Sequence, residues 1–170
     1  MLASISAFGL LHTAISILPI FLGLFAFVRD GRIDPKNRLG RLYLLTTLAG
    51  SVTSWGFLPA KGFTPGQGLT LLTLATLAVG TLTLRGRWRG EGYVQTISLT
   101  FSYLLLMVFA TTETLTRVPV GRPFASGPAD PALTPVRLGL LAAFALWTAY
   151  QLLQLRAAAA PQAAPAGRAA

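Results

Sequence analysis

Cysteine is absent from this chain of 170 residues, and histidine occurs once, as His12. The lack of cysteine excludes a disulfide framework, a thiolate metal site and thiol redox chemistry. With a single histidine, a zinc site would have to be built almost entirely from carboxylates, which is not how protein zinc sites are made. The sequence therefore predicts neither a metal site nor a bound cofactor.

Charged residues are scarce as well: they make up 11% of the chain, against 53% hydrophobic residues. Soluble domains carry about 25% charged residues. The charges gather in short clusters between long apolar stretches, a pattern typical of integral membrane proteins. The net charge of +9 does not indicate nucleic acid, because the basic residues flank apolar stretches and form no continuous stripe. We predict the lipid bilayer as the partner.

Five stretches are apolar enough to approach the roughly 20 residues that cross a bilayer core. The predicted fold is an all-α polytopic bundle in one domain, residues 1–156. Its helices are expected at about 7–28, 35–60, 65–85, 93–117 and 135–156. The Ala/Pro-rich tail, residues 157–170, is expected to be disordered.

Three residue pairs predict where helices begin. Asp34-Pro35, Thr64-Pro65 and Thr134-Pro135 each read as an N-cap followed by proline at the first helical position. At the N-terminus, no basic residue precedes the first apolar stretch, which is also longer than the apolar part of a signal peptide. We expect this stretch to be a helix of the bundle rather than a cleaved signal.

The basic residues predict the orientation of the bundle. Eight of them lie in two loops: Arg29, Arg32, Lys36, Arg38, Arg41, Arg85, Arg87 and Arg89. Arginine and lysine accumulate on the cytoplasmic side of membrane proteins. We therefore predict a multi-pass protein of the bacterial inner membrane with the N-terminus outside and the C-terminus in the cytoplasm. These side chains are also expected to contact anionic lipid headgroups.

Three ionisable residues near the predicted outer face form a candidate ligand-binding site. His12 lies about 7 Å into the first helix and Glu113 about 6 Å from the end of the fourth, at 1.5 Å per residue. Ionisable residues within membrane segments are functional candidates, so we predict a site of His12, Glu113 and Arg117. In the alternative, Glu113 and Arg117 form a local i,i+4 ion pair. His12 then only bonds a carbonyl or a threonine of another helix.

Serine and threonine recur in three of the predicted helices. In the second and third they include Thr46, Thr47, Ser51, Thr53, Ser54, Thr70, Thr73 and Thr76. Small hydroxyl residues can line a polar path, but they more often allow close helix packing and bond their own i−4 carbonyls. We favour packing.

The first half of the chain carries a pattern of its own. His12 lies early in the first helix, and the basic loop ends in Lys36-Asn37-Arg38-Leu39-Gly40-Arg41-Leu42-Tyr43. This stretch resembles the N-terminal half of an uncharacterised family of bacterial membrane proteins, whose loop reads His-Arg-x-x-Gly-Arg-x-Tyr. Here Lys-Asn replaces His-Arg. The resemblance implies a multi-pass membrane fold and no particular activity.

The function predicted from these features is non-enzymatic: a binding or partner subunit with a polar site near the outer leaflet. Its partner would be another membrane protein, a second copy, a lipid, or a small amphiphile such as a quinone. The first alternative is an oligomeric transport subunit for a proton or small solute. The second is an oxidoreductase subunit binding a quinone or haem, which the single histidine disfavours.

Overall fold

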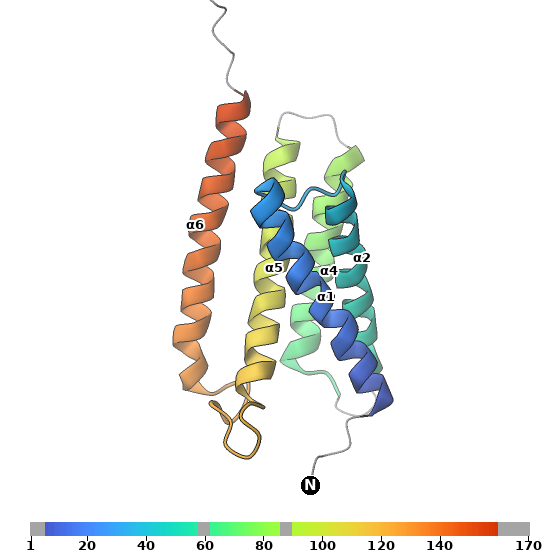
Figure 1. The fold of residues 1–170 in the computed structure, drawn as a ribbon, viewed down its shortest axis with the longest axis vertical. Helices are drawn as coiled ribbons and strands as arrows, with labels where there is room; N and C mark the ends of the chain where they lie inside the picture. Colours follow the sequence, from blue (N-terminus) through green and yellow to red (C-terminus); the bar gives the residue numbers. More distant parts are fainter. Residues whose placement is uncertain (1–5, 58–61, 86–89, 160–170) are drawn as a thin grey trace, which may run out of the picture.

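The computed structural model describes residues 6–57, 62–85 and 90–159. Within these ranges the chain forms the long helices α1 (Ala7–Asp30), α2 (Arg38–Ser54), α4 (Pro65–Leu82), α5 (Glu91–Leu115) and α6 (Thr134–Ala159). They lie side by side, and successive helices run in opposite directions (Figure 1). The described residues contain no strand, so the prediction of an all-α bundle is confirmed.

Three short 3-10 segments extend or precede these helices: η1 (Trp55–Phe57), η2 (Thr83–Arg85) and η3 (Pro131–Leu133). Several predicted boundaries shift by a few residues. α1 ends at Asp30 rather than at residue 28, and α5 spans 91–115 rather than 93–117. α6 continues to Ala159, so the predicted disorder is wrong for residues 157–159, and the rest of that tail lies outside the described residues.

The bundle has two ends of different character. We call one the basic end: it carries the 30–38 connection, η2 and the last turn of α6 (Figure 1). The opposite, amino-terminal end carries the start of α1, η1 and the 116–133 loop. Arg29, Arg32, Lys36, Arg38, Arg41 and Arg85 all belong to the basic end, and Arg87 and Arg89 lie outside the described residues.

Four of the described helical segments are long and apolar enough to cross a membrane: Ala7–Asp30, Pro65–Arg85, Glu91–Leu115 and Pro131–Ala159. α2 is the exception among the five predicted crossings. It has 17 residues and begins with two arginines in its first turn. Nevertheless it packs against both α1 and α4 and continues into η1, within the bundle rather than beside it.

The structure confirms one of the predicted helix starts and contradicts another. α4 begins at Pro65 as predicted, with the Thr64 N–H donating to Gln67 Oε1 at 2.9 Å. The predicted start at Asp34-Pro35 is wrong. Asp34 Oδ1 accepts from the Lys36 N–H at 2.9 Å, which makes a tight turn, and Asn37 becomes the N-cap of α2.

The last predicted start, Thr134-Pro135, has the right position, but the capping residue is not Thr134. α6 does begin at Thr134, but the 3-10 turn η3 precedes it directly. Asp130 caps that turn, accepting from the Ala132 N–H at 2.9 Å. Because the chain is already helical before Thr134, that residue does not serve as the N-cap.

Close approach and buried hydrogen bonds hold the basic half of the bundle together. A Cβ at Gly40 would lie 1.9 Å from the Asp34 carbonyl oxygen, so only glycine fits there. Tyr43 is fully buried, and its hydroxyl lies 2.8 Å from Ser102 Oγ on α5. In membranes, where apolar burial does not drive helix association, such contacts carry much of the packing energy. They give a structural reason for the Gly40-x-x-Tyr43 spacing.

Candidate functional site

A small cavity of about 60 Å³ lies between α1, α2, α4 and α5, towards the amino-terminal end. Its polar lining consists of His12, Ser16, Thr47, Ser51, Ser54, Thr70 and Thr73, and its apolar lining includes Pro19, Leu105 and Phe109. One enclosed water needs about 10–15 Å³ of such space. The cavity therefore has room for a few waters or for one small polar ligand.

The hydrogen bonds of His12 depend on which ring nitrogen carries the proton. His12 Nδ1 lies 2.8 Å from Thr53 Oγ1, and the Thr53 hydroxyl lies 2.9 Å from the Ala49 carbonyl oxygen. When the Thr53 hydroxyl donates to that carbonyl, the Nδ1–H is the donor to Thr53, because a hydroxyl has one proton. In this arrangement the neutral imidazole keeps a lone pair on Nε2. Ser16 Oγ lies 3.4 Å from Nε2.

The threonine hydroxyls of the lining also donate to carbonyl oxygens of their own helices. Thr47 donates to the Tyr43 carbonyl at 2.7 Å, and Thr73 donates to the Leu69 carbonyl at 2.8 Å. Each hydroxyl that donates its hydrogen bond within its own helix keeps two lone pairs that can accept other hydrogen bonds. The threonine rows thus both pack and line a site. The walls offer more acceptors than donors and suit a ligand that donates hydrogen bonds.

Two close contacts shape the surroundings of His12. A Cβ at Gly50 would lie 3.1 Å from Ser16 Oγ, so glycine lets α1 and α2 approach closely beside the cavity. The Phe57 ring meets the His12 ring edge-on, with 5.2 Å between centroids. The imidazole is therefore held by Thr53 on one side and by an aromatic ring on another.

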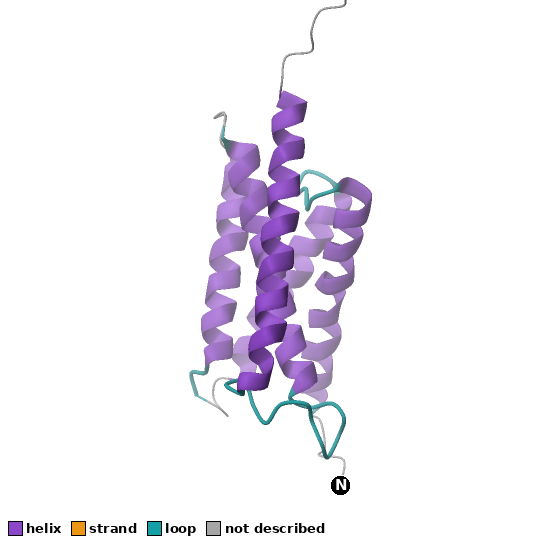
Figure 2. Cartoon of the chain, turned by 90° about the vertical axis from the view of Figure 1, so that its left-hand side faces the viewer, coloured by secondary structure: helices purple, strands orange, loops and turns teal. Residues whose placement is uncertain are grey.

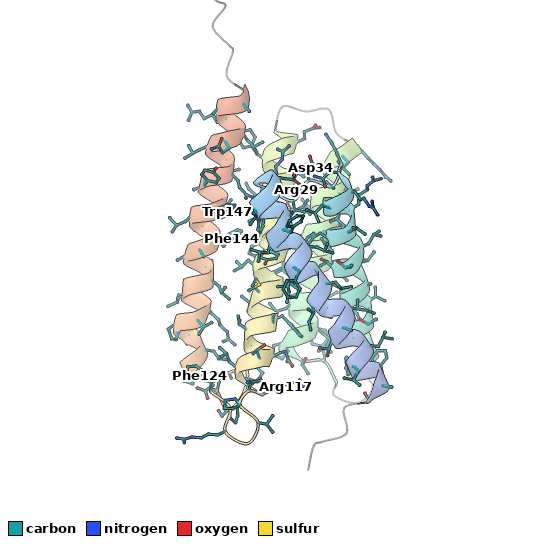
Figure 3. The ribbon with its side chains drawn as sticks, in the orientation of Figure 1. Arg29, Asp34, Arg117, Phe124, Phe144 and Trp147 are labelled. Carbon is teal, nitrogen blue, oxygen red and sulfur yellow. The ribbon has the colours of Figure 1, made fainter. Side chains whose placement is uncertain are left out.

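Glu113 and Arg117 lie elsewhere at the same end. They form a salt bridge with each other across one turn of α5, and their side chains are 39% and 66% exposed. Neither is among the described residues that line the cavity. The structure thus places His12 in a polar site, with Glu113 outside that site as a nearby charge; Figure 3 labels Arg117 at the end of α5.

Sequence reasoning named His12, and for the serines and threonines around it, apart from Ser16, it favoured packing over a polar path. Thr47, Ser51 and Ser54 recur at a spacing of four and three residues, which places them on one face of α2. That spacing was available as a signal for a polar face. Ser16 carries the same signal, four residues after His12.

The fold and the cavity define a class: all-helical proteins whose long apolar helices suit a membrane and have between them a small pocket that includes one imidazole and several hydroxyl groups. Comparison of the chain with protein-family models, curated proteins and solved structures finds no match. The family resemblance of the first half therefore stays a prediction.

Proposed function

We propose that this protein is a non-enzymatic binding protein of the bacterial inner membrane whose ligand is a small hydrogen-bond donor. Water-sized donors, such as the ammonium or hydronium ion, match the volume of about 60 Å³. The observation that carries the proposal is the set of acceptors around the cavity: His12 Nε2 and the lone pairs of Thr47 and Thr73.

The charge near the cavity supports a cationic ligand. The Glu113 carboxylate lies at the same end of the bundle as His12, outside the cavity lining. A cation held at Nε2 would be stabilised by that carboxylate, since a desolvated charge in a membrane needs an opposite charge nearby. In this proposal Glu113 is a remote counter-charge and Arg117 moderates it through their salt bridge.

The proposed orientation places the cavity in the outer half of the membrane. The basic end faces the cytoplasm under the positive-inside rule, and Arg38 and Arg41 are exposed there to anionic headgroups. His12 lies five residues after Ala7, or about 8 Å along α1 from the amino-terminal end. A donor ligand would therefore enter from the external side.

The single histidine makes this proposal directly testable. Protein labelled with ¹⁵N in the histidine ring and held in lipid nanodiscs gives one pair of imidazole resonances, which we expect to show the Nδ1–H tautomer. Ammonium chloride should shift the Nε2 resonance in a saturable way. Tetramethylammonium chloride should not, because that cation has no N–H to donate.

Adjacent threonines supply the matched variants. Thr47→Val removes a hydroxyl from the cavity wall, whereas Thr46→Val removes one that does not line it. We expect the saturable shift to weaken by about tenfold for T47V, as for the loss of one good hydrogen bond, and to persist in T46V. Equal shifts in both variants would show that the cavity is not the binding site.

A flux measurement distinguishes the transport alternative from the binding role. Liposomes carrying the same protein and a trapped pH indicator report ammonium entry as an internal pH change. Saturable binding without flux supports the binding role, whereas flux that T47V abolishes would replace it with the transport role.

A further inference from the structure

The 116–133 loop joins α5 to α6 at the amino-terminal end and is tied to the last turn of α5. The Ala125 N–H donates to the carbonyl of Leu115, the last residue of α5, at 3.0 Å, and Ala125 is buried. Phe124, the residue before it, is 57% exposed. Figure 3 labels Phe124 at the foot of α6, close to the level at which α5 ends. A large apolar side chain is therefore exposed at the level of a helix end.

The preceding residues of this loop form its tip. The Arg122 N–H donates to the Pro119 carbonyl at 3.1 Å, which closes a turn with Val120 and Gly121 at its centre. Gly121 has a φ of 88°, a conformation that suits glycine. Val120 is 85% exposed, and the loop projects beyond the ends of the helices in both Figure 1 and Figure 2. The chain from Val120 to Phe124 thus runs from the tip back to the level of the helix ends.

The length of α5 places Phe124 at a membrane surface. α5 is long and apolar enough to cross a membrane, and its 25 residues span about 37 Å, whereas the hydrocarbon core is about 30 Å thick. A centred helix therefore extends about 4 Å beyond the core at each end, so that Leu115 lies in the headgroup layer. Phe124 shares this level through the Ala125–Leu115 hydrogen bond. Exposed phenyl rings at this depth bury themselves at the boundary between headgroups and acyl chains.

Arg122 supplies a charge that suits the phosphate group of a lipid. It is exposed and makes no salt bridge with any residue that the structure describes. The one acid of this loop, Asp130, is occupied within the loop, where it accepts from the Ser126 and Ala132 N–H groups at 2.7 and 2.9 Å. An arginine two residues from an exposed phenyl ring can keep its charge among the phosphates while the ring contacts acyl chains.

We propose that Phe124 and Arg122 anchor this loop to the bilayer surface at the amino-terminal end. The ring lies at the boundary between headgroups and acyl chains, the guanidinium binds a lipid phosphate, and Val120 stays in water. The inference depends on the membrane placement of α5 and α6. It does not involve the His12 cavity or its ligand.

The test uses single cysteines, because the chain has none of its own. Protein in lipid vesicles carries a spin label at F124C, R122C or V120C. Collisions of the label with oxygen, which concentrates in lipid, are compared with collisions with a water-soluble nickel complex. We expect the oxygen-to-nickel ratio to fall in the order F124C, R122C, V120C. L146C, at a 75% exposed position of α6, gives the ratio for full contact with lipid.

Two results of this measurement would overturn the proposal. Equal ratios at F124C and V120C would show that the whole loop lies in water. Few collisions of the F124C label with either reagent would show that a protein, not lipid, covers Phe124. All three labelled positions are exposed, so the label should leave the fold intact.

Charge variants test the phosphate contact separately. In vesicles of phosphatidylglycerol, Arg122→Glu should increase nickel collisions at the F124C label, because the anionic surface repels a carboxylate. Arg122→Lys keeps the charge and should leave the depth of the label unchanged. Equal label depths in R122E and R122K would overturn the assignment of Arg122 to a lipid phosphate.

Discussion

The helices α5 and α6 are both long and apolar, yet they differ in how much of each is buried and in how many helices each contacts. In the most apolar 18-residue stretch of α5, 39% is buried within the protein, whereas in that of α6 the buried share is 11%. α5 packs against α1, α4 and α6, whereas α6 packs mainly against α5. The difference shows that hydropathy marks both helices for the membrane but does not determine their place in the bundle. Small and polar residues at the contacts do so.

The core of α1, α2, α4 and α5 therefore behaves as a packed unit, and α6 as an attached helix held by a few specific bonds. Variants of matched chemistry can test this contrast, because the chain offers pairs of the same residue type in the two environments. The variants below are ordered by the size of the expected effect.

Gly40→Ala should have the largest effect. The new Cβ would lie 1.9 Å from the Asp34 carbonyl oxygen, a backbone atom that cannot move aside freely. We expect the free energy of unfolding to fall by more than about 3 kcal/mol, the upper range for overpacking, or the protein not to fold. Gly139→Ala on α6 meets nothing within 4 Å and should be neutral or slightly stabilising. Thermal unfolding in detergent compares the two, and equal stability would contradict the close packing at Gly40.

Gln151→Leu should release α6 from the core. Gln151 is buried and bonds both Thr100 on α5 and the Gly31 carbonyl at the end of α1. At about 0.6–1.7 kcal/mol for each interhelical bond, the loss should reach about 1–3 kcal/mol. Gln154→Leu changes an exposed residue of the same helix and should cost little. Spin labels on α5 and α6 should separate in Q151L alone; an unchanged distance would show that apolar contacts suffice to hold α6.

Tyr43→Phe should have a smaller effect within the core. It removes the 2.8 Å hydrogen bond to Ser102, but Ser102 Oγ still donates to the Leu99 carbonyl at 2.7 Å. We expect about 0.6 kcal/mol of destabilisation, typical of one hydrogen bond between membrane helices. Tyr150→Phe, at an exposed position on α6, is the control. A loss as large as that of Q151L would mean that the core also depends on single bonds.

The smallest effect concerns the loop that leads into α6. Asp130 accepts from the Ser126 N–H at 2.7 Å and the Ala132 N–H at 2.9 Å, and the Ser126 bonds lower the pKa of its carboxyl below the ordinary 3.8. A lowered pKa in the folded state stabilises the loop above pH 4, and this contribution is lost as the pH falls through the folded pKa. The protection of the Ser126 amide against exchange, measured relative to its intrinsic rate, should fall there. Asp130→Asn should remove that pH dependence, whereas a profile unchanged by the variant would contradict the assignment.

Much of this architecture could be predicted from the sequence, because long apolar stretches and N-cap residues act locally. Thr64-Pro65 marks the start of α4 correctly, since its capping contact lies within one turn. Asp34-Pro35 fails for a reason that the pattern does not contain. The close approach of Gly40 to the Asp34 carbonyl keeps that segment in a turn and moves the start of α2 to Arg38.

The site was harder to predict than the fold, because it depends on how each helix is rotated about its axis. The prediction of a shared site for His12 and Glu113 depended on their matched depth, and the described cavity lining contains His12 but not Glu113. Depth alone could not show that Glu113 pairs with Arg117 while Thr53 binds the imidazole.

The proposed place of the His12 cavity near the outer leaflet depends on the orientation of the bundle. Because the chain has no cysteine, single cysteines can be placed at Val120, in the loop of the amino-terminal end, and at Ala158, beyond Arg156. In intact bacteria a membrane-impermeant maleimide should label V120C readily and A158C only after the membrane is opened. Labelling of both from outside, or of A158C alone, would contradict the account.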